Sequence, residues 1–125
     1  MASELRVNTL KDAAGANSVA MEYVAGGSAK HWIRFIGTGT VAIRDSLSAS
    51  SVTDNGTGDY TVAISNSLSD ANYCLLIGET DWRTAGAPDE AAITASDYDL
   101  LSRSPNNATA LDSTVNSIAI HGDLA

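Results

Sequence analysis

The stretch that decides the fold covers residues 37–77 and reads GTGTVAIRDSLSASSVTDNGTGDYTVAISNSLSDANYCLLI. Apolar residues alternate with polar or small ones at residues 41–44 and again at residues 60–65, which places successive side chains on opposite faces of a strand. Between these segments lies Asn55-Gly56, a dipeptide typical of tight hairpin turns, because such turns need positive φ at both central residues. We therefore expect residues 51–53 and 59–61 to pair as a hairpin.

The end of this stretch is less regular. Residues 67–72 are polar and broken, and we interpret them as a turn or a single helical turn. The run YCLLI that follows, residues 73–77, is apolar throughout, which fits a strand covered on both faces; periodicity alone does not exclude a buried helical segment. Cys74, the one cysteine, is expected here as a small buried hydrophobic residue, since disulfide frameworks and metal sites need more than one.

The N-terminal segment suggests an arm. Residues 3–10 alternate and indicate an edge strand, and residues 18–24 indicate a second strand, so the two segments predict a hairpin. The sequence AGGS at residues 25–28 breaks this pattern and gives a boundary between an arm, residues 1–25, and a β-domain, residues 26–125. Leu5 and Val7 are then candidates for contact with a neighbouring molecule. The alternative is an ordinary loop inside one domain, residues 1–125.

Residues 30–37, KHWIRFIG, form the most strongly amphipathic strand pattern. His31, Ile33 and Phe35 share one face. Trp32 and Ile36 lie on the other face, and large apolar side chains on a second face indicate that it too is covered. We therefore predict Trp32 and Ile36 as contacts with a partner subunit.

The C-terminal half completes the strand count. We expect residues 78–92 to form a long polar contact loop around Trp82. Residues 93–102 and 114–121 indicate two further strands, the second with a change of parity at Ser117 that suggests a bulge or a doubly covered strand. With no helix predicted, these segments give an all-β fold, an antiparallel β-sandwich or barrel-like roll of about eight short strands with an N-terminal hairpin or arm.

Size and charge narrow the function classes. A chain of 125 residues is at most one domain, and its core is modest because aromatic residues are 6% of it and alanine is frequent. Such a core favours oligomerisation. A net charge of −8 opposes binding to nucleic acid or to anionic membrane, and no apolar run approaches the ~20 residues that span a bilayer.

No catalytic, cofactor or metal motif stands out. Gly37 and Gly39 could suggest a phosphate-binding loop. Such a loop precedes a helix, whereas these glycines precede a strand pattern. His31 and His121 with Cys74 are too few for a zinc site by spacing, although histidines from several subunits could meet on a threefold axis. Paired carboxylates at Asp97 and Asp99, and at Asp54 and Asp59, are expected to be solvated or to cap turns. We predict a protein that is not an enzyme and needs no cofactor.

Three segments together resemble a known group of proteins. They are SELRVNTLKDA from residue 3, GGSAKHWIRFIGTGTVAIRDS from residue 26 and VTDNGTGDYTVAISNSLSDANY from residue 52. They resemble small proteins of tailed bacteriophages and prophages, especially those of aquatic bacteria, described as tail-fibre or virion structural proteins. The resemblance covers roughly residues 3–77. The last strand, which ends at residues 121–123, also resembles the C-terminus of that group. It implies a non-catalytic, commonly homotrimeric component of the virion surface, although this chain lacks a long fibre shaft.

The expectation is therefore a homotrimeric virion protein that is made in the bacterial cytoplasm. It would contact other virion proteins either as a tail-fibre or tip module that binds a host surface glycan or protein, or as a capsid decoration (cement) protein. The alternative is a carbohydrate-binding or carbohydrate-active β-domain that depends on Trp82, Asp97 or Asp99.

Overall fold

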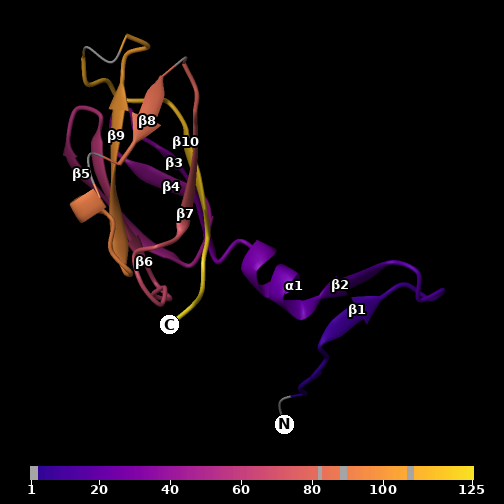
Figure 1. Ribbon diagram of the computed structural model, residues 1–125. Coiled ribbons are helices and arrows are strands. Elements are labelled where there is room, and N and C mark those ends of the chain that lie inside the picture. The colour runs from indigo at the N-terminus through magenta and orange to yellow at the C-terminus, as the bar shows by residue number, and fades with distance from the viewer. Residues whose placement is uncertain (1–2, 82, 88–89, 107–108) are drawn as a thin grey trace.

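Two four-stranded antiparallel sheets face each other as a sandwich, and an N-terminal arm stands clear of it (Figure 1). The computed structural model describes residues 3–81, 83–87, 90–106 and 109–125. The first sheet, called here the β3 sheet, has the spatial order β4 (Ala42–Leu47), β3 (His31–Ile36), β10 (Asn116–His121) and β7 (Cys74–Glu79). The second, the β6 sheet, has the order β5 (Ala49–Gly56), β6 (Asp59–Ile64), β9 (Asp97–Arg103) and β8 (Thr84–Gly86). The predicted all-β sandwich is confirmed.

The core lies between the two sheets and follows the strand alternation. On β3, residues 31, 33 and 35 are buried while 32 and 34 are exposed, as predicted. The rings of Phe35 and Tyr60 meet edge to face across the sheets, with centroids 5.3 Å apart. The buried hydrophobic residues are Ile33, Phe35, Tyr60, Val62, Ile64, Leu68, Tyr98, Leu100, Ile118 and Ile120.

The predicted hairpin is confirmed, but its turn lies two residues further along. Strands β5 and β6 pair with Val52 opposite Val62 and Thr53 opposite Thr61, and the turn residues are Thr57 and Gly58. The register shifts between Asp54 and Gly56, so Asn55 lies in a bulge rather than at the turn centre. Gly58 has φ +66°, and a Cβ there would lie 2.4 Å from the Ser102 carbonyl oxygen. Tertiary packing around Gly58 therefore decides where the chain turns.

Ser48 forms the corner where the chain passes from the β3 sheet to the β6 sheet. It has a left-handed backbone, φ 60°, between β4 and β5. Its carbonyl oxygen accepts hydrogen bonds from His31 Nδ1 at 3.0 Å and from the Ser65 N–H at 2.8 Å. Its Oγ accepts one from the Asn66 N–H at 3.0 Å. These bonds hold an unfavourable backbone conformation and close one side of the sandwich.

The N-terminal prediction was only partly right. A hairpin forms, but β1 is Thr9–Lys11 and β2 is Ser18–Ala20, with Leu10 opposite Val19. Residues 3–8 are not a strand, because β2 is too short to pair with them. The expected strand at residues 18–24 instead turns into α1 (Met21–Gly27), so the prediction of no helix was wrong. Over the seven residues of α1, local periodicity did not distinguish a helix from a strand.

Strand β7 also differs from expectation. It is covered on one face only, since each sheet of the sandwich packs against a single other sheet. The prediction of a doubly covered strand was wrong, and Cys74 is exposed rather than buried. The expected turn at residues 67–72 is confirmed, since these residues form no helix or strand.

The segment from residue 78 to residue 92 is not a single polar loop. It contains the end of β7, all of β8 and a 3-10 helix, η1 (Glu90–Ala92). Trp82, the expected centre of that loop, lies outside the described residues. Part of the segment instead supplies an edge strand of the β6 sheet.

Both predicted C-terminal strands form, but each begins later than expected: β9 is Asp97–Arg103 rather than 93–102, and β10 is Asn116–His121 rather than 114–121. On β9, Tyr98 and Leu100 share the buried face. On β10, Asn116, Ile118 and Ile120 point inward, and the pairing with β3 and β7 runs without a bulge. The change of parity arises because Val115 precedes the strand. Within the described residues, no helix is long and apolar enough to cross a membrane.

Candidate functional site

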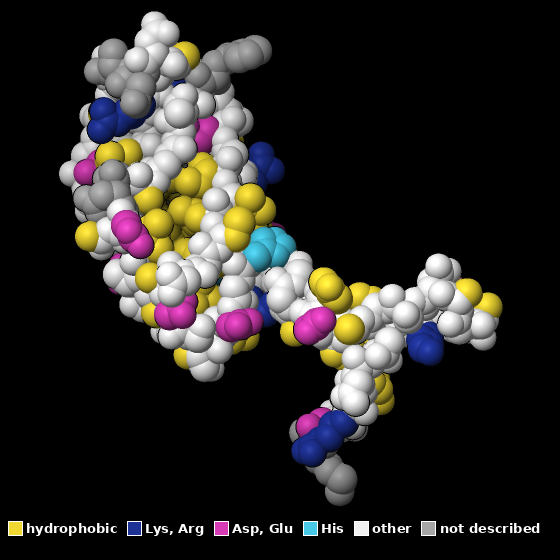
Figure 2. Space-filling model, viewed as in Figure 1, with side chains coloured by type: hydrophobic (Ala, Val, Ile, Leu, Met, Phe, Trp, Pro, Cys, Tyr) yellow, Lys and Arg dark blue, Asp and Glu magenta, His cyan; other side chains and the backbone are white. Residues whose placement is uncertain are grey.

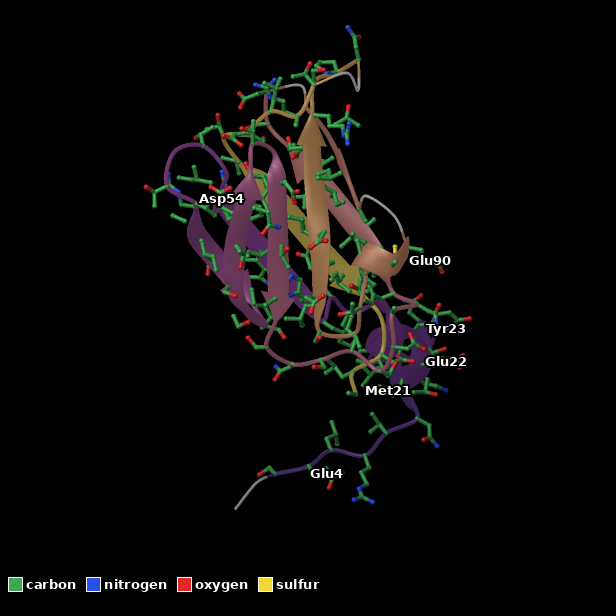
Figure 3. The ribbon with its side chains drawn as sticks, turned by 90° about the vertical axis from the view of Figure 1, so that its left-hand side faces the viewer. Glu4, Met21, Glu22, Tyr23, Asp54 and Glu90 are labelled. Carbon is green, nitrogen blue, oxygen red and sulfur yellow. The ribbon has the colours of Figure 1, made fainter. Side chains whose placement is uncertain are left out.

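The N-terminal arm, defined here as residues 3–28, exposes its apolar side chains. None of its residues is buried. Leu5 is 81% exposed and Tyr23 is 70% exposed, and Leu10 and Val19 are exposed partners on the hairpin. Figure 2 shows hydrophobic side chains along the arm, and Figure 3 shows Tyr23 on α1 at the edge of the molecule. An arm of this kind has apolar surface for contact with another molecule.

The joint between the arm and the sandwich is built from hydrogen bonds. The Lys30 ammonium donates to the carbonyl oxygens of Ala25 and of Ser28, the latter at 2.8 Å, so it binds at the C-terminal end of α1. A cation is favourable there because it meets the negative end of the helix dipole. The Lys30 N–H donates to the Ile120 carbonyl oxygen at 2.9 Å. These bonds tie α1 to β10 and direct the arm outward (Figure 1).

The outer face of the β3 sheet carries a row of apolar side chains, called here the apolar stripe. Strand register places Leu47 opposite Trp32, Trp32 opposite Ala119, and Ala119 opposite Leu76. One apolar residue from each of the four strands therefore lies in one line across the sheet. Leu47 is 46% exposed, Trp32 36% and Leu76 52%. Such a row on a solvent face is typical of a contact surface.

Two cations lie beside this stripe. Arg34 is two residues from Trp32 on the same face of β3, and Arg44 lines a shallow pocket together with Arg34 and Val115. Asp45 lies opposite Arg34 in the register. The ion pair that the described residues form is on the arm, between Arg6 and Glu4, so neither arginine has an ion-pair partner among them. The outer face of the β3 sheet therefore combines an apolar stripe with two arginines and one aspartate.

The outer face of the β6 sheet has the opposite character. Asp99 accepts a hydrogen bond from Thr61 Oγ1 at 2.6 Å, and Thr61 in turn accepts one from the Asn55 amide at 2.9 Å. Asp97 accepts from Thr94 Oγ1 at 3.0 Å. Both carboxylates are thus engaged by neighbouring hydroxyl groups. The two outer faces of the sandwich differ in charge balance: Arg34, Arg44 and Asp45 lie on the β3 sheet, whereas β9 presents Asp97, Asp99 and Arg103.

His31 is a core residue with both ring nitrogens engaged. Because the Ser48 carbonyl oxygen only accepts, Nδ1 carries the proton, and Nε2 accepts from the Tyr98 hydroxyl at 3.0 Å. Burial lowers the pKa of His31, although the bond to Ser48 opposes this change. His31 therefore holds the two sheets together as a neutral imidazole. The described residues contain no cluster of three or more histidine, cysteine or acidic side chains that could hold a metal ion.

A polar cluster lies inside one end of the sandwich. Both carboxylate oxygens of Glu79 are buried without a hydrogen bond, as are both polar atoms of the Asn116 amide and the Ser102 hydroxyl. Burial raises the pKa of Glu79, while the Ser102 hydroxyl and the Arg83 charge act in the opposite direction without forming a bond within 3.5 Å. Burial also raises the pKa of Tyr60, as do its bond to Asp112 and the charge of Asp112.

The structure places the predicted contact residues in two groups. Trp32 and Ile36 share the outer face of β3, as expected, with Ile36 half-buried. Leu5 and half-buried Val7 lie on the arm, away from that face. Sequence reasoning missed Leu47, Ala119 and Leu76, because only the register between distant strands aligns them with Trp32. Local periodicity could not mark Leu76 as outward-facing, because every residue of the run at 73–77 is apolar.

Comparison with known proteins adds no assignment. No protein-family model matches the chain, and the comparisons with curated proteins and with solved structures likewise found no match.

Proposed function

We propose that this protein is a non-enzymatic structural protein of a bacteriophage virion, a homotrimeric module on the particle surface. It serves either as a tail-fibre or tip module or as a capsid decoration (cement) protein. The resemblance of residues 3–77 to small phage virion proteins supports this proposal. No nucleic acid or membrane is assigned as a partner, in keeping with the net charge of −8.

The observation that carries the proposal is the arm. A segment in which no residue is buried, and which exposes Leu5 and Tyr23, suits a protein that is anchored in a larger assembly. The sandwich then presents its hydroxyl-rich, acidic β6 sheet away from the anchor. Two ionisable side chains support a non-enzymatic role, since His31 and Asp99 are both engaged in structural hydrogen bonds.

Immunogold electron microscopy of intact phage particles tests the proposal. An antibody against this chain should label every particle. Gold over the head would identify a decoration protein, and raised heat resistance of preformed capsids on adding the protein would support that role. Gold at the tail would identify a fibre or tip module, which should bind host cells. Particles without gold would overturn the proposal.

The second candidate is a carbohydrate-binding or carbohydrate-active domain. Asp97 and Asp99 favour it, because both carboxylates lie on one outer face of β9. Such a domain should bind or cleave sugars, and Asp99→Asn or Trp82→Ala should abolish this. Particles that carry the gold label, together with a protein that does not bind sugar, would exclude this second candidate and leave the virion role as the remaining proposal.

A further inference from the structure

Two apolar features of this chain have no apolar partner within its described part: the arm and the apolar stripe. We propose that the arm of one copy packs against the apolar stripe of a second copy, with Tyr23 over the stripe and Glu22 facing Arg34. This inference rests on the self-association proposed above, but it does not depend on a location in the virion. It assigns the contact through which the copies assemble.

The arm needs a surface in order to hold its structure. Strands β1 and β2 have three residues each, and α1 has seven. Isolated two-stranded hairpins and helices shorter than about 12 residues are marginal in water. The arm has no buried residue of its own to offset this cost. Covering Leu5, Leu10 and Tyr23 with a second molecule would remove this apolar surface from water and so stabilise the arm.

The joint directs the arm away from its own sheet. Lys30 holds the end of α1 through the carbonyl oxygens of Ala25 and Ser28, and its own N–H is bound to Ile120. Folding back over the stripe of the same chain would break these bonds. Figure 1 shows the arm extending from the sandwich as a separate projection. The occupant of the stripe is therefore a different molecule.

Charge selects the β3 sheet as the surface that the arm meets. Glu22 is exposed beside Tyr23 on α1, and α1 has an acidic first turn with no basic residue in its last turn. Arg34 and Arg44 lie beside the stripe without an ion-pair partner among the described residues, and Asp45 opposite Arg34 offsets one of these two charges. On the opposite face of the sandwich β9 presents Asp97 and Asp99 against Arg103 alone, a balance that would repel Glu22. A second copy supplies both halves of the contact.

The first experiment measures the association of full-length variants by light scattering during size exclusion, from about 1 to 100 μM. Wild type should be oligomeric. Leu76→Lys on the stripe and Tyr23→Lys on the arm should each weaken association about tenfold or more, since each removes an apolar contact and places a charge in it. Thr53→Lys on the β6 sheet and Ala14→Lys at the exposed turn of the arm hairpin are matched controls and should leave association unchanged.

The possible outcomes separate the two proposals. A monomeric wild type would overturn the homo-oligomer and this contact together. An oligomer that persists in both Leu76→Lys and Tyr23→Lys would overturn this contact and leave self-association standing. Dissociation by Tyr23→Lys alone would mean that arms pack on one another, or on a surface other than the stripe, and would also overturn the contact. Circular dichroism establishes that each variant is folded.

The second experiment is a charge exchange. Glu22→Arg and Arg34→Glu should each weaken association, and the double variant should associate more tightly than either single variant, because it restores opposite charges across the contact. Additive weakening in the double variant would overturn the pairing of Glu22 with Arg34.

The native cysteine gives an independent check. Cys74 is exposed and lies two residues before Leu76 on the same face of β7. In Gly26→Cys, one turn along α1 from Tyr23 and with open space for a side chain, a short bismaleimide should link residue 26 of one copy to Cys74 of another. The same substitution combined with Cys74→Ser is the control and should lose this link. Peptide mapping that finds no link between residues 26 and 74 would overturn the proposed placement of α1.

Discussion

At the scale of single residues, Gly58 shows how tertiary packing sets a turn. Gly58 and Gly39 have nearly the same φ, +66° and +67°, but a Cβ meets backbone atoms at Gly58 and open space at Gly39. We expect Gly39→Ala to cost about 1–2 kcal/mol for the left-handed backbone alone. Gly58→Ala should cost more, because the Ser102 carbonyl would also have to move. Urea unfolding of both variants measures the difference, and equal losses would contradict the predicted clash.

Glu79 is a residue whose charge opposes folding. Its pKa is raised above 4.5 by burial, so between 4.5 and the raised value the folded protein holds a proton that the unfolded chain has released. The free energy of unfolding should therefore fall as pH rises through this window. Glu79→Gln should unfold at a higher temperature than wild type at pH 7, with a smaller difference at pH 4. A lower unfolding temperature at pH 7 would show that the carboxylate has a necessary partner, such as Arg83.

His31 acts in the opposite pH direction. Burial lowers its pKa below 6.5, so as pH falls under 6.5 the unfolded chain binds a proton that the folded protein does not. This residue should lower the free energy of unfolding as pH falls from 6.5 through its depressed pKa. Nitrogen-15 NMR should show a neutral ring with the proton on Nδ1 at pH 6.5. A charged ring at that pH would contradict the bond from Tyr98 to Nε2.

At the scale of elements, each strand of this sandwich has one structural face and one free face. Leu100 on β9 is fully buried, whereas Leu76 on β7 is 52% exposed. We expect Leu100→Ala to cost about 2–5 kcal/mol, as core truncations do. Leu76→Ala should cost well under this in the dissociated chain. Chemical denaturation at low protein concentration tests both, and similar losses would mean that the outer face of β7 is covered within one copy.

The same two faces explain how much the sequence predicted. The buried set on β3 and the pairing of β5 with β6 follow from local alternation and a short connection, so both were predicted correctly. The stripe was not, because Trp32 and Leu76 become neighbours only through β10, which lies more than 80 positions after β3 begins. The prediction of a strand in the α1 segment was wrong because its seven residues have no strong preference for helix or strand. Its conformation depends instead on the joint at Lys30.

At the scale of the whole molecule, assembly and stability should be coupled. If the oligomer is held by arms and stripes, folded chains are stabilised by mass action, and the unfolding temperature depends on protein concentration. For wild type it should rise by several degrees between about 2 and 200 μM, whereas for Leu76→Lys, whose association is weaker, the rise should be smaller. Scanning calorimetry of both proteins measures this. A concentration-independent wild type that is nevertheless oligomeric would mean that the copies dissociate only after the sandwich has unfolded, and that the arm contact adds nothing to stability.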